Sequence, residues 1–154
     1  DRSKWYAPLI IMGNTAMNEA VTEEHYTSYH YEAAIASEHL ISKSFEETTW
    51  DKILMWYERL FEIQPATITA LNIAVVHIQR KDFAKADKLL VEMDPLDLEQ
   101  RAYLYYGAWA ELYSQQKVYD KAIKSLNEAI RLVNNDAEKS YLLKKKRTLE
   151  AMNV

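Results

Sequence analysis

Histidine and acidic side chains are the residues of this 154-residue chain that come nearest to a catalytic or metal-binding set. None of the histidines forms the pair at i and i+4 beside a glutamate that a helical zinc motif requires. His25 and His30 are five residues apart and therefore fall on different faces of a helix. The other two are His39 and His77. We expect no catalytic residue, no metal site and no cofactor, so the chain is not expected to be an enzyme.

Aromatic side chains are concentrated in two segments and suit peptide binding. The segments carry Trp50, Trp56, Tyr57 and Phe61, and Tyr103, Tyr105, Tyr106, Trp109 and Tyr113. Tyr106, Trp109 and Tyr113 share one helical stripe and are expected to pack between helix pairs. Trp56, Tyr103 and Tyr105 cannot all fit on the buried stripe. Together with Glu111, which is chosen for its expected exposure and its position, they are the candidate protein-contact residues. Simple filling of gaps between helices is the alternative.

The composition is that of one globular domain and points away from β-rich folds. The chain is 49% hydrophobic and 27% charged, with only two glycines and three prolines for tight turns. The absence of cysteine excludes disulfides and thiolate metal sites, and it fits a cytoplasmic location. No apolar run approaches the roughly 18 residues that span a bilayer, so no membrane partner is expected.

Charge patterning does not indicate a nucleic-acid surface in this chain. The net charge is −4, and the basic run Lys144–Arg147 spreads around a helix instead of lining a groove. Basic residues near the C-terminal end of a helix complement its dipole, so this run is interpreted as a solvated face. Phosphate contact is the alternative. The chain begins at Asp1 in mid-pattern, and we expect it to be a fragment of a longer protein.

Apolar periodicity predicts an all-α chain of about eight helices. Short connections make consecutive helices antiparallel. Thr48 with Asp51 is expected to form a capping box, and Asp94 before Pro95 predicts a helix start. The expected helices are Lys4–Ala20, Glu24–Ile41, one capped by Thr48 that ends before Pro65, Thr67–Gln79, Phe83–Met93 capped by Asp82, Pro95–Ser114, one within Tyr119–Asp136, and Asp136–Met152 capped by Asn135 or Asp136.

A constant spacing of 36 residues relates two of these helices position by position. It carries Phe83, Ala86, Leu90 and Met93 onto Tyr119, Ala122, Leu126 and Ala129, and it carries Ala74 onto Ala110 and His77 onto Tyr113. An earlier copy, Trp50, Ile53, Tyr57 and Leu60, precedes the first set by 33 residues. A helix–turn–helix unit of roughly 34 residues is the tetratricopeptide period.

The repeat predicts a single domain over residues 1–154, a right-handed superhelix of antiparallel helix pairs. The alanines are expected where a neighbouring helix crosses closely, and an irregular helical bundle is the alternative. Two positions depart from the usual pattern, because Lys81 and Lys117 replace the glycine of the turn. The inward positions include Leu71, Val75, Gly107 and Glu111. These cannot form the lysine and asparagine clamp of the chaperone-tail receptors, so that function is not expected.

An ordered series of blocks adds a family resemblance. The blocks are DRSKW (Asp1–Trp5), Leu9–Ile10 with Gly13, YHYEAAIASEH (Tyr29–His39), TTWDKILMWYERL (Thr48–Leu60), and Pro65 with LNIAVV (Leu71–Val76). The series resembles the C-terminal helical extension of bacterial RNA polymerase sigma factors related to the extracytoplasmic-function (ECF) type. The resemblance covers residues 1–154. The sequence departs from the family pattern at Glu38. It also departs at Ile73, because the family usually has arginine at that position.

The resemblance implies a longer protein whose N-terminal part holds sigma regions 2 and 4, which bind core polymerase and read the promoter. DNA would be contacted only through that part, which is absent from these residues. The chain itself would be a noncatalytic regulatory or protein-interaction domain in transcription initiation. Its protein partner would be its own sigma regions or the polymerase core. A free-standing peptide-binding adaptor of tetratricopeptide type is the alternative function.

Overall fold

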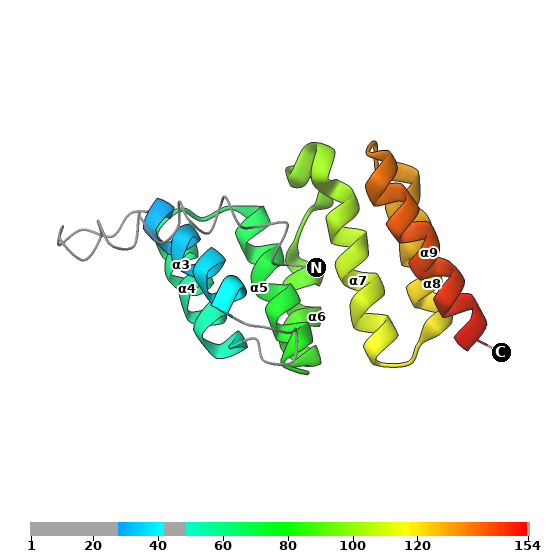
Figure 1. Cartoon of the computed structure of the whole chain (residues 1–154), viewed down its shortest axis with the longest axis horizontal. Helices are drawn as coiled ribbons and strands as arrows, with labels where there is room; N and C mark the ends of the chain where they lie inside the picture. The colour runs from blue at the N-terminus through cyan, green and yellow to red at the C-terminus, as the bar shows by residue number, and fades with distance from the viewer. Residues whose placement is uncertain (1–27, 42–48, 154) are drawn as a thin grey trace. The chain divides into compact units, whose positions relative to one another are not determined.

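The computed structural model describes residues 28–41 and 49–153 of the chain (Figure 1). These residues form seven α-helices and one 3-10 helix, and they contain no strand, which confirms the all-α class. The chain divides into two compact units, Asp1–Val76 and His77–Val154. The single domain over residues 1–154 stays a prediction. The expected helix Lys4–Ala20 and the start of Glu24–Ile41 lie outside the described residues.

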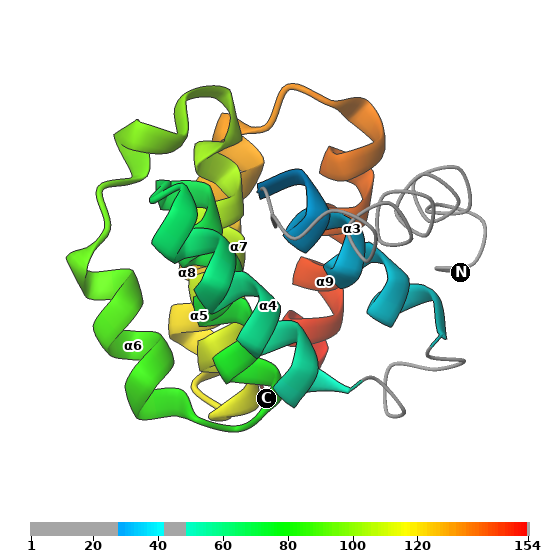
Figure 2. The ribbon, with the colours of Figure 1, turned by 90° about the vertical axis from the view of Figure 1, so that its left-hand side faces the viewer.

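The first unit contains α3 (Ser28–Ile41) and α4 (Trp50–Ile63), which lie side by side (Figure 2). Tyr31 packs on Trp56 with ring centroids 5.7 Å apart. His39 lies edge-on to Trp50 at 6.0 Å. The start of α3 therefore meets the middle of α4, and the end of α3 meets the start of α4, so the two helices are antiparallel. Their buried apolar side chains include Ala33, Ala34, Ile35, Ile53, Leu54 and Leu60.

The start of α4 corrects the expected capping box. The N-cap is Thr49, one residue later than expected, and its side chain makes no cap hydrogen bond. Thr48 lies outside the described residues. Asp51 falls in the first turn, where a negative charge is favoured by the helix dipole. The helix ends at Ile63 as predicted, because the chain must leave helical backbone angles before Pro65.

The helix α5 (Thr67–Gln79) has the predicted bounds, and it begins in the first unit and ends in the second. It is followed by α6 (Phe83–Glu92), with Asp82 at the N-cap position as predicted. The Asp82 side chain makes no cap hydrogen bond, however. Its carboxylate instead lies 3.3 Å from the Arg80 guanidinium.

The expected single helix Pro95–Ser114 is wrong. A 3-10 helix, η1 (Pro95–Arg101), comes first and α7 (Ala102–Gln115) follows. Asp94 does cap the start of η1, since its side chain accepts a hydrogen bond from the Leu96 amide at 3.0 Å.

The helical backbone is broken inside η1, at Glu99, whose backbone angles (φ 55°, ψ −117°) are not helical. Leu98 beside it is 3% exposed, so burial of an apolar side chain fixes this segment. Burial of this leucine is the physical reason that we see for the interruption. The apolar periodicity of the sequence continues through the segment and so gave no warning of it.

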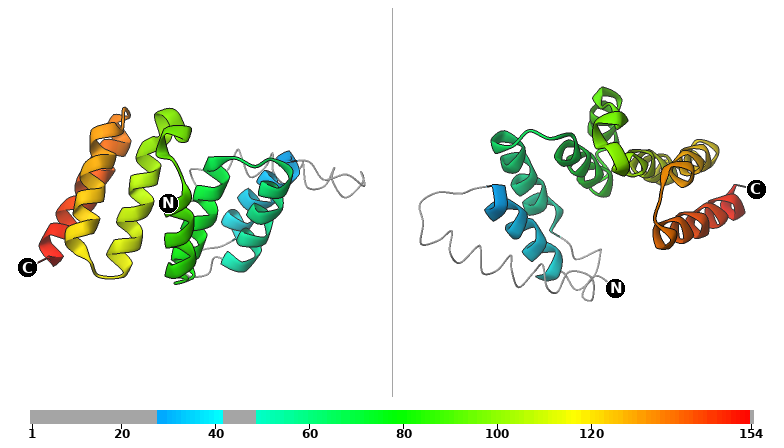
Figure 3. Two further views of the ribbon diagram at one scale, coloured as in Figure 1. Left: turned by 180° about the vertical axis from the view of Figure 1, so that it is seen from behind. Right: turned by 90° about the horizontal axis from the view of Figure 1, so that it is seen from above.

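The second unit ends with α8 (Tyr119–Leu132) and α9 (Asp136–Met152). A short turn joins α7 to α8, and the two helices run side by side in opposite directions (Figure 3). Asn135 caps α9 as predicted, because its side chain accepts a hydrogen bond from the Glu138 amide at 3.0 Å.

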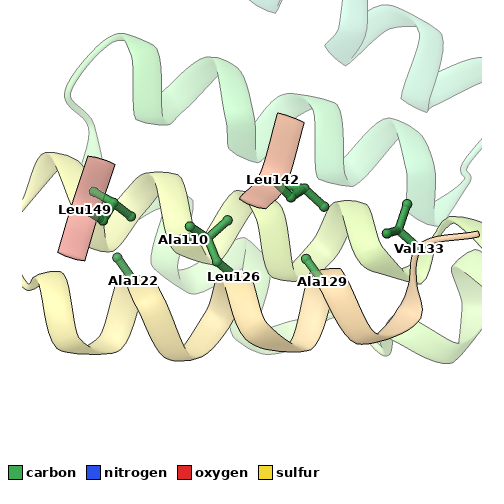
Figure 4. Packing of buried hydrophobic residues seen from close by; sticks show 7 residues of the cluster. All are labelled: Ala110, Ala122, Leu126, Ala129, Val133, Leu142 and Leu149. Carbon is green, nitrogen blue, oxygen red and sulfur yellow. The ribbon is translucent and has the colours of Figure 1, made fainter. Parts of the chain in front are cut away.

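One apolar cluster holds α7, α8 and α9 together (Figure 4). Its buried members are Ala110, Ala122, Leu126, Ala129, Val133, Leu142 and Leu149. Ala122 and Ala129 are on the same face of α8, and both are fully buried. A methyl group at these positions lets the neighbouring helices approach closely, as the sequence predicted.

Candidate interaction surfaces

The turn between α5 and α6 and the turn between α7 and α8 have the same hydrogen bonds, 36 residues apart. In the first turn, the Lys81 amide donates to the Ile78 carbonyl at 3.0 Å, and the Asp82 amide donates to the His77 carbonyl at 2.8 Å. In the second turn, the Lys117 amide donates to the Ser114 carbonyl at 3.0 Å, and the Val118 amide donates to the Tyr113 carbonyl at 2.9 Å. This pair of bonds is the Schellman motif that ends a helix.

Lys81 and Lys117 both adopt the left-handed conformation that this motif requires, with φ of 66° and 62°. The sequence noted both lysines as replacements for glycine, and the structure shows that they keep the glycine conformation. Burial follows the same spacing. The pairs Ala74 and Ala110, Ala86 and Ala122, and Leu90 and Leu126 are all fully buried. The aromatic residues that open α6 and α8, Phe83 and Tyr119, are both half-buried.

An aromatic ladder runs along α7. Trp109 stacks on Tyr113 with centroids 5.4 Å apart, and Tyr105 lies edge-on to Trp109 at 6.4 Å. Lys121 of α8 places its ammonium group 5.6 Å from the Tyr113 ring. Tyr105 extends the ladder, while Tyr106 lies edge-on to Tyr105 with centroids 5.2 Å apart and packs, like Tyr113, against the cluster of Figure 4.

A chain of polar contacts joins α7 to α9 and to the turn before α6. The Lys145 ammonium donates to Glu111 at 2.6 Å, and Gln115 donates to the other Glu111 oxygen at 2.9 Å. The Lys81 ammonium donates to the Gln115 side chain at 2.6 Å. Two of these links, Lys81 to Gln115 and Glu111 to Lys145, join residues 34 apart, close to the repeat length.

Glu111 is ionised within this chain of contacts. Burial alone would raise its pKa, but the Lys145 charge, the hydrogen bonds from Gln115 and Lys145, and the Lys81 charge together hold the pKa below its ordinary value. The side chains of Lys145 and Glu111 are 27% and 28% exposed, so solvent still screens the pair. The arrangement satisfies charges within the protein and leaves little of Glu111 for a ligand.

The remaining candidate contact residues also have partners inside the protein. The Tyr105 hydroxyl donates to the Leu90 carbonyl at 3.0 Å and so fastens α7 to α6. Trp56 lies between the Tyr31 ring and the Arg59 guanidinium, which is 5.6 Å from the ring centroid. Tyr103 packs against the cluster of Figure 4. Burial and the Glu138 charge raise the pKa of Tyr103 against the opposing charge of Arg101.

The four candidate contact residues were chosen because exposure was expected, and the structure shows all four half-buried. Trp56 lies in the first unit and the other three in the second. Their role as protein contacts stays a prediction. Sequence reasoning missed Lys81, Gln115 and Lys145, although the 34-residue spacing of these polar residues was a usable signal.

Of the histidines that the structure describes, His77 lies 3.9 Å from the Asp82 carboxylate. Among residues 28–41 and 49–153, no set of three histidine, aspartate or glutamate side chains could hold a metal ion. His30 and His77 are both buried, and His25 lies outside the described residues. Within the same ranges, no helix has the length and apolar character needed to cross a bilayer.

Comparison with known proteins gives one relative. An uncharacterized protein of Rhizobium meliloti (strain 1021) is 29% identical to this chain over 143 residues. The match covers 92% of this chain and 33% of the relative, so the chain spans about a third of the length of the curated relative it matches. No known protein family matches the chain, and no solved structure matches it.

Proposed function

We propose that this chain is the noncatalytic, cytoplasmic C-terminal regulatory domain of a bacterial ECF-type RNA polymerase sigma factor. We further propose that its helix pairs stack as a right-handed superhelix of tetratricopeptide type. The observation that carries the proposal is the Schellman turn that recurs after 36 residues with matching buried alanines on both sides. Repeats of this kind act by presenting side chains to other proteins.

The resemblance to the sigma factor extension supplies the biological part of the proposal. Three of its five blocks fall at least partly on α3, α4 and α5, where they provide buried residues of each helix, and the first two blocks lie outside the described residues. Ile73, which stands where the family usually has arginine, is itself buried. A charged side chain at that position would require a buried partner, so this chain differs from the family in its packing there.

The match to one third of a longer relative favours a domain of a longer polypeptide over a free-standing adaptor. In the proposal, the rest of the polypeptide carries the sigma regions that bind polymerase and DNA. The partner of this chain is then its own sigma regions or the polymerase core.

Reconstituted transcription tests the proposal. The full polypeptide is compared with a version that lacks this chain, each with bacterial core polymerase and a promoter library. We expect both to initiate, with a change in rate or promoter choice when the chain is removed. A full polypeptide that does not support initiation with any promoter would contradict the sigma factor assignment. Unchanged rate and unchanged promoter choice would contradict the regulatory role.

A further inference from the structure

One face of α4 carries both carboxylates and exposed apolar side chains. Asp51, Met55, Glu58 and Glu62 follow one another at steps of four, three and four residues, so they form a single stripe about 16 Å long. All four are exposed, and Met55 in the middle is 37% exposed. Here this stripe, together with Ile63 beside it at the end of the helix, is called the α4 face.

The α4 face has the apolar content of a contact surface. Besides Met55, Ile63 is 49% exposed. The packed side of the helix is already used, since Ile53, Leu54 and Leu60 are buried. A helix with a complete buried side does not need two more large apolar side chains at its surface for its own folding.

Two carboxylates of this face, those of Glu58 and Glu62, are available to a partner. Glu58 and Glu62 form no ion pair within the part of the chain that the structure describes. The basic residue nearest along the same helix, Arg59, places its guanidinium over Trp56. A positively charged partner would therefore meet two carboxylates that need not leave an existing partner.

The negative charge of the chain is also concentrated in the part that contains α4. Residues 1–76 contain 11 acidic and 5 basic residues, a net charge of −6, whereas residues 77–154 contain 12 and 14, a net charge of +2. The acidic excess lies in the unit that contains α4. Surfaces that bind DNA are basic, because they neutralise phosphates with lysine and arginine.

We propose that the α4 face docks onto the positively charged, DNA-binding surface of the remaining part of the same polypeptide and competes there with DNA. This inference rests on the proposed function, which supplies a DNA-binding part. The match to one third of a longer relative gives such a partner room outside this chain. Met55 and Ile63 would contact apolar side chains between the basic ones, and Glu58 and Glu62 would pair with lysine or arginine.

The test uses the full polypeptide and a matched pair of charge reversals. The variant E58K/E62K changes the α4 face, and the control D87K/E92K makes the same charge change at exposed positions of α6. Binding to a DNA duplex is measured at several salt concentrations. We expect E58K/E62K to bind DNA about tenfold more tightly than wild type, a typical size for coupling between two binding events. The control should change affinity by about twofold at most, through its overall charge alone.

Zero-length carbodiimide cross-linking gives a second readout on the wild-type polypeptide. This reagent joins a carboxylate to a lysine only when the two are in ion-pair contact. We expect cross-links from Glu58 or Glu62 to lysines outside residues 1–154, which disappear when excess DNA is added. Should E58K/E62K fold poorly by circular dichroism, E58Q/E62Q removes the charges with less disturbance and should raise DNA affinity in the same direction.

Equal affinities for E58K/E62K and its control would overturn the docking surface, and so would cross-links confined to residues 1–154. Failure of this inference is distinguishable from failure of the proposed function. A polypeptide that initiates transcription but shows neither effect contradicts only the α4 face. A polypeptide that neither binds DNA nor supports initiation contradicts both.

Discussion

The hairpins centred on Lys81 and Lys117 share their turn but differ in how their second helix ends. The turns have the same two hydrogen bonds and the same left-handed lysine. The helix after the first turn, α6, ends at Glu92, whereas α8 continues to Leu132 and is 14 residues long against 10. The core residues that face the neighbouring helix therefore specify that a hairpin forms. Other residues specify the length of its second helix.

Proline explains the shorter helix. Pro95 lies 36 residues before Arg131, which is in the last turn of α8. A proline at this point forces the residue before it out of helical backbone angles, so α6 stops early. Ala129 in α8 is fully buried beside α9, but the corresponding Met93 lies beyond α6 with extended backbone angles. Proline thus shortens the second helix of one hairpin without disturbing the turn that both hairpins share.

The largest expected effect in the comparison of the two hairpins comes from replacing the leucine in the second helix of each hairpin, α6 and α8. Leu90 and Leu126 are both fully buried. We expect Leu90→Ala and Leu126→Ala each to lower the free energy of unfolding by about 3 kcal/mol, the usual cost of truncating a buried leucine. Urea unfolding followed by circular dichroism measures both.

Leu96→Ala is the control for this pair, because Leu96 is 78% exposed. Its substitution should change the free energy of unfolding by less than about 0.5 kcal/mol. If truncation at Leu90 costs no more than truncation at Leu96, the two hairpins do not share a packing arrangement, and the repeat loses its physical basis.

The ion pair between Glu111 and Lys145 has no counterpart in the first hairpin, because the residue 36 positions before Glu111 is Val75, which carries no charge. We expect a double-mutant cycle of Glu111→Gln and Lys145→Met to give a coupling of about 1 kcal/mol, the upper range for a solvent-screened pair. The coupling should shrink as salt is added. The same cycle at the exposed pair, with Glu128→Gln and Arg131→Met, is the control. A coupling no larger than that of the control pair would show that the contact between α7 and α9 gains nothing from its partial burial.

The same carboxylate predicts a pH effect of definite sign. The pKa of Glu111 is lower in the folded protein than its ordinary value of 4.5. Its contribution to stability is therefore present above pH 4.5 and is lost as the pH falls through the folded pKa. Thermal unfolding measured from neutral pH to acid should show a smaller loss for Glu111→Gln than for the wild-type protein. Parallel curves for the two proteins would rule out this contribution.

Sequence periodicity located the helices well, because each buries one apolar stripe whose spacing is visible in the sequence. The bounds of α5 and the start of α8 were predicted correctly for this reason. The break at Glu99 was not, since it depends on where Leu98 finds a buried position in three dimensions.

Exposure of the candidate contacts was the least predictable property. Spacing says which side chains share a face but not whether a neighbouring helix covers that face. Tyr105, for example, is held by a carbonyl of α6 that lies 15 residues earlier in the chain. The contact of Lys145 with Glu111 likewise depends on how α9 crosses α7, which no local pattern encodes.

A smaller test compares Gly107 with Leu71, which lies 36 residues earlier and is 2% exposed. Gly107 lies inside α7, and a Cβ added there would meet nothing within 4 Å. We expect Gly107→Ala to raise the free energy of unfolding by about 0.5–1 kcal/mol, because alanine favours helix over glycine. Urea unfolding measures the change. A loss of stability would show that Gly107 has a close neighbour. The surroundings of Gly107 and of buried Leu71 would then be more alike.

The turn lysines provide the smallest and most specific comparison. Both residues have positive φ, which favours glycine, so Lys117→Gly should stabilise the protein by about 0.5 kcal/mol after allowance for the freer unfolded chain. Lys81→Gly should gain less, because it also removes the hydrogen bond to Gln115. Lys81→Gly in a Gln115→Ala background should then match Lys117→Gly, since the side-chain contact that distinguishes the two turns is gone. If the two glycine variants still differ in that background by urea unfolding, the turns differ in their backbones, and the hairpins are not copies of one unit.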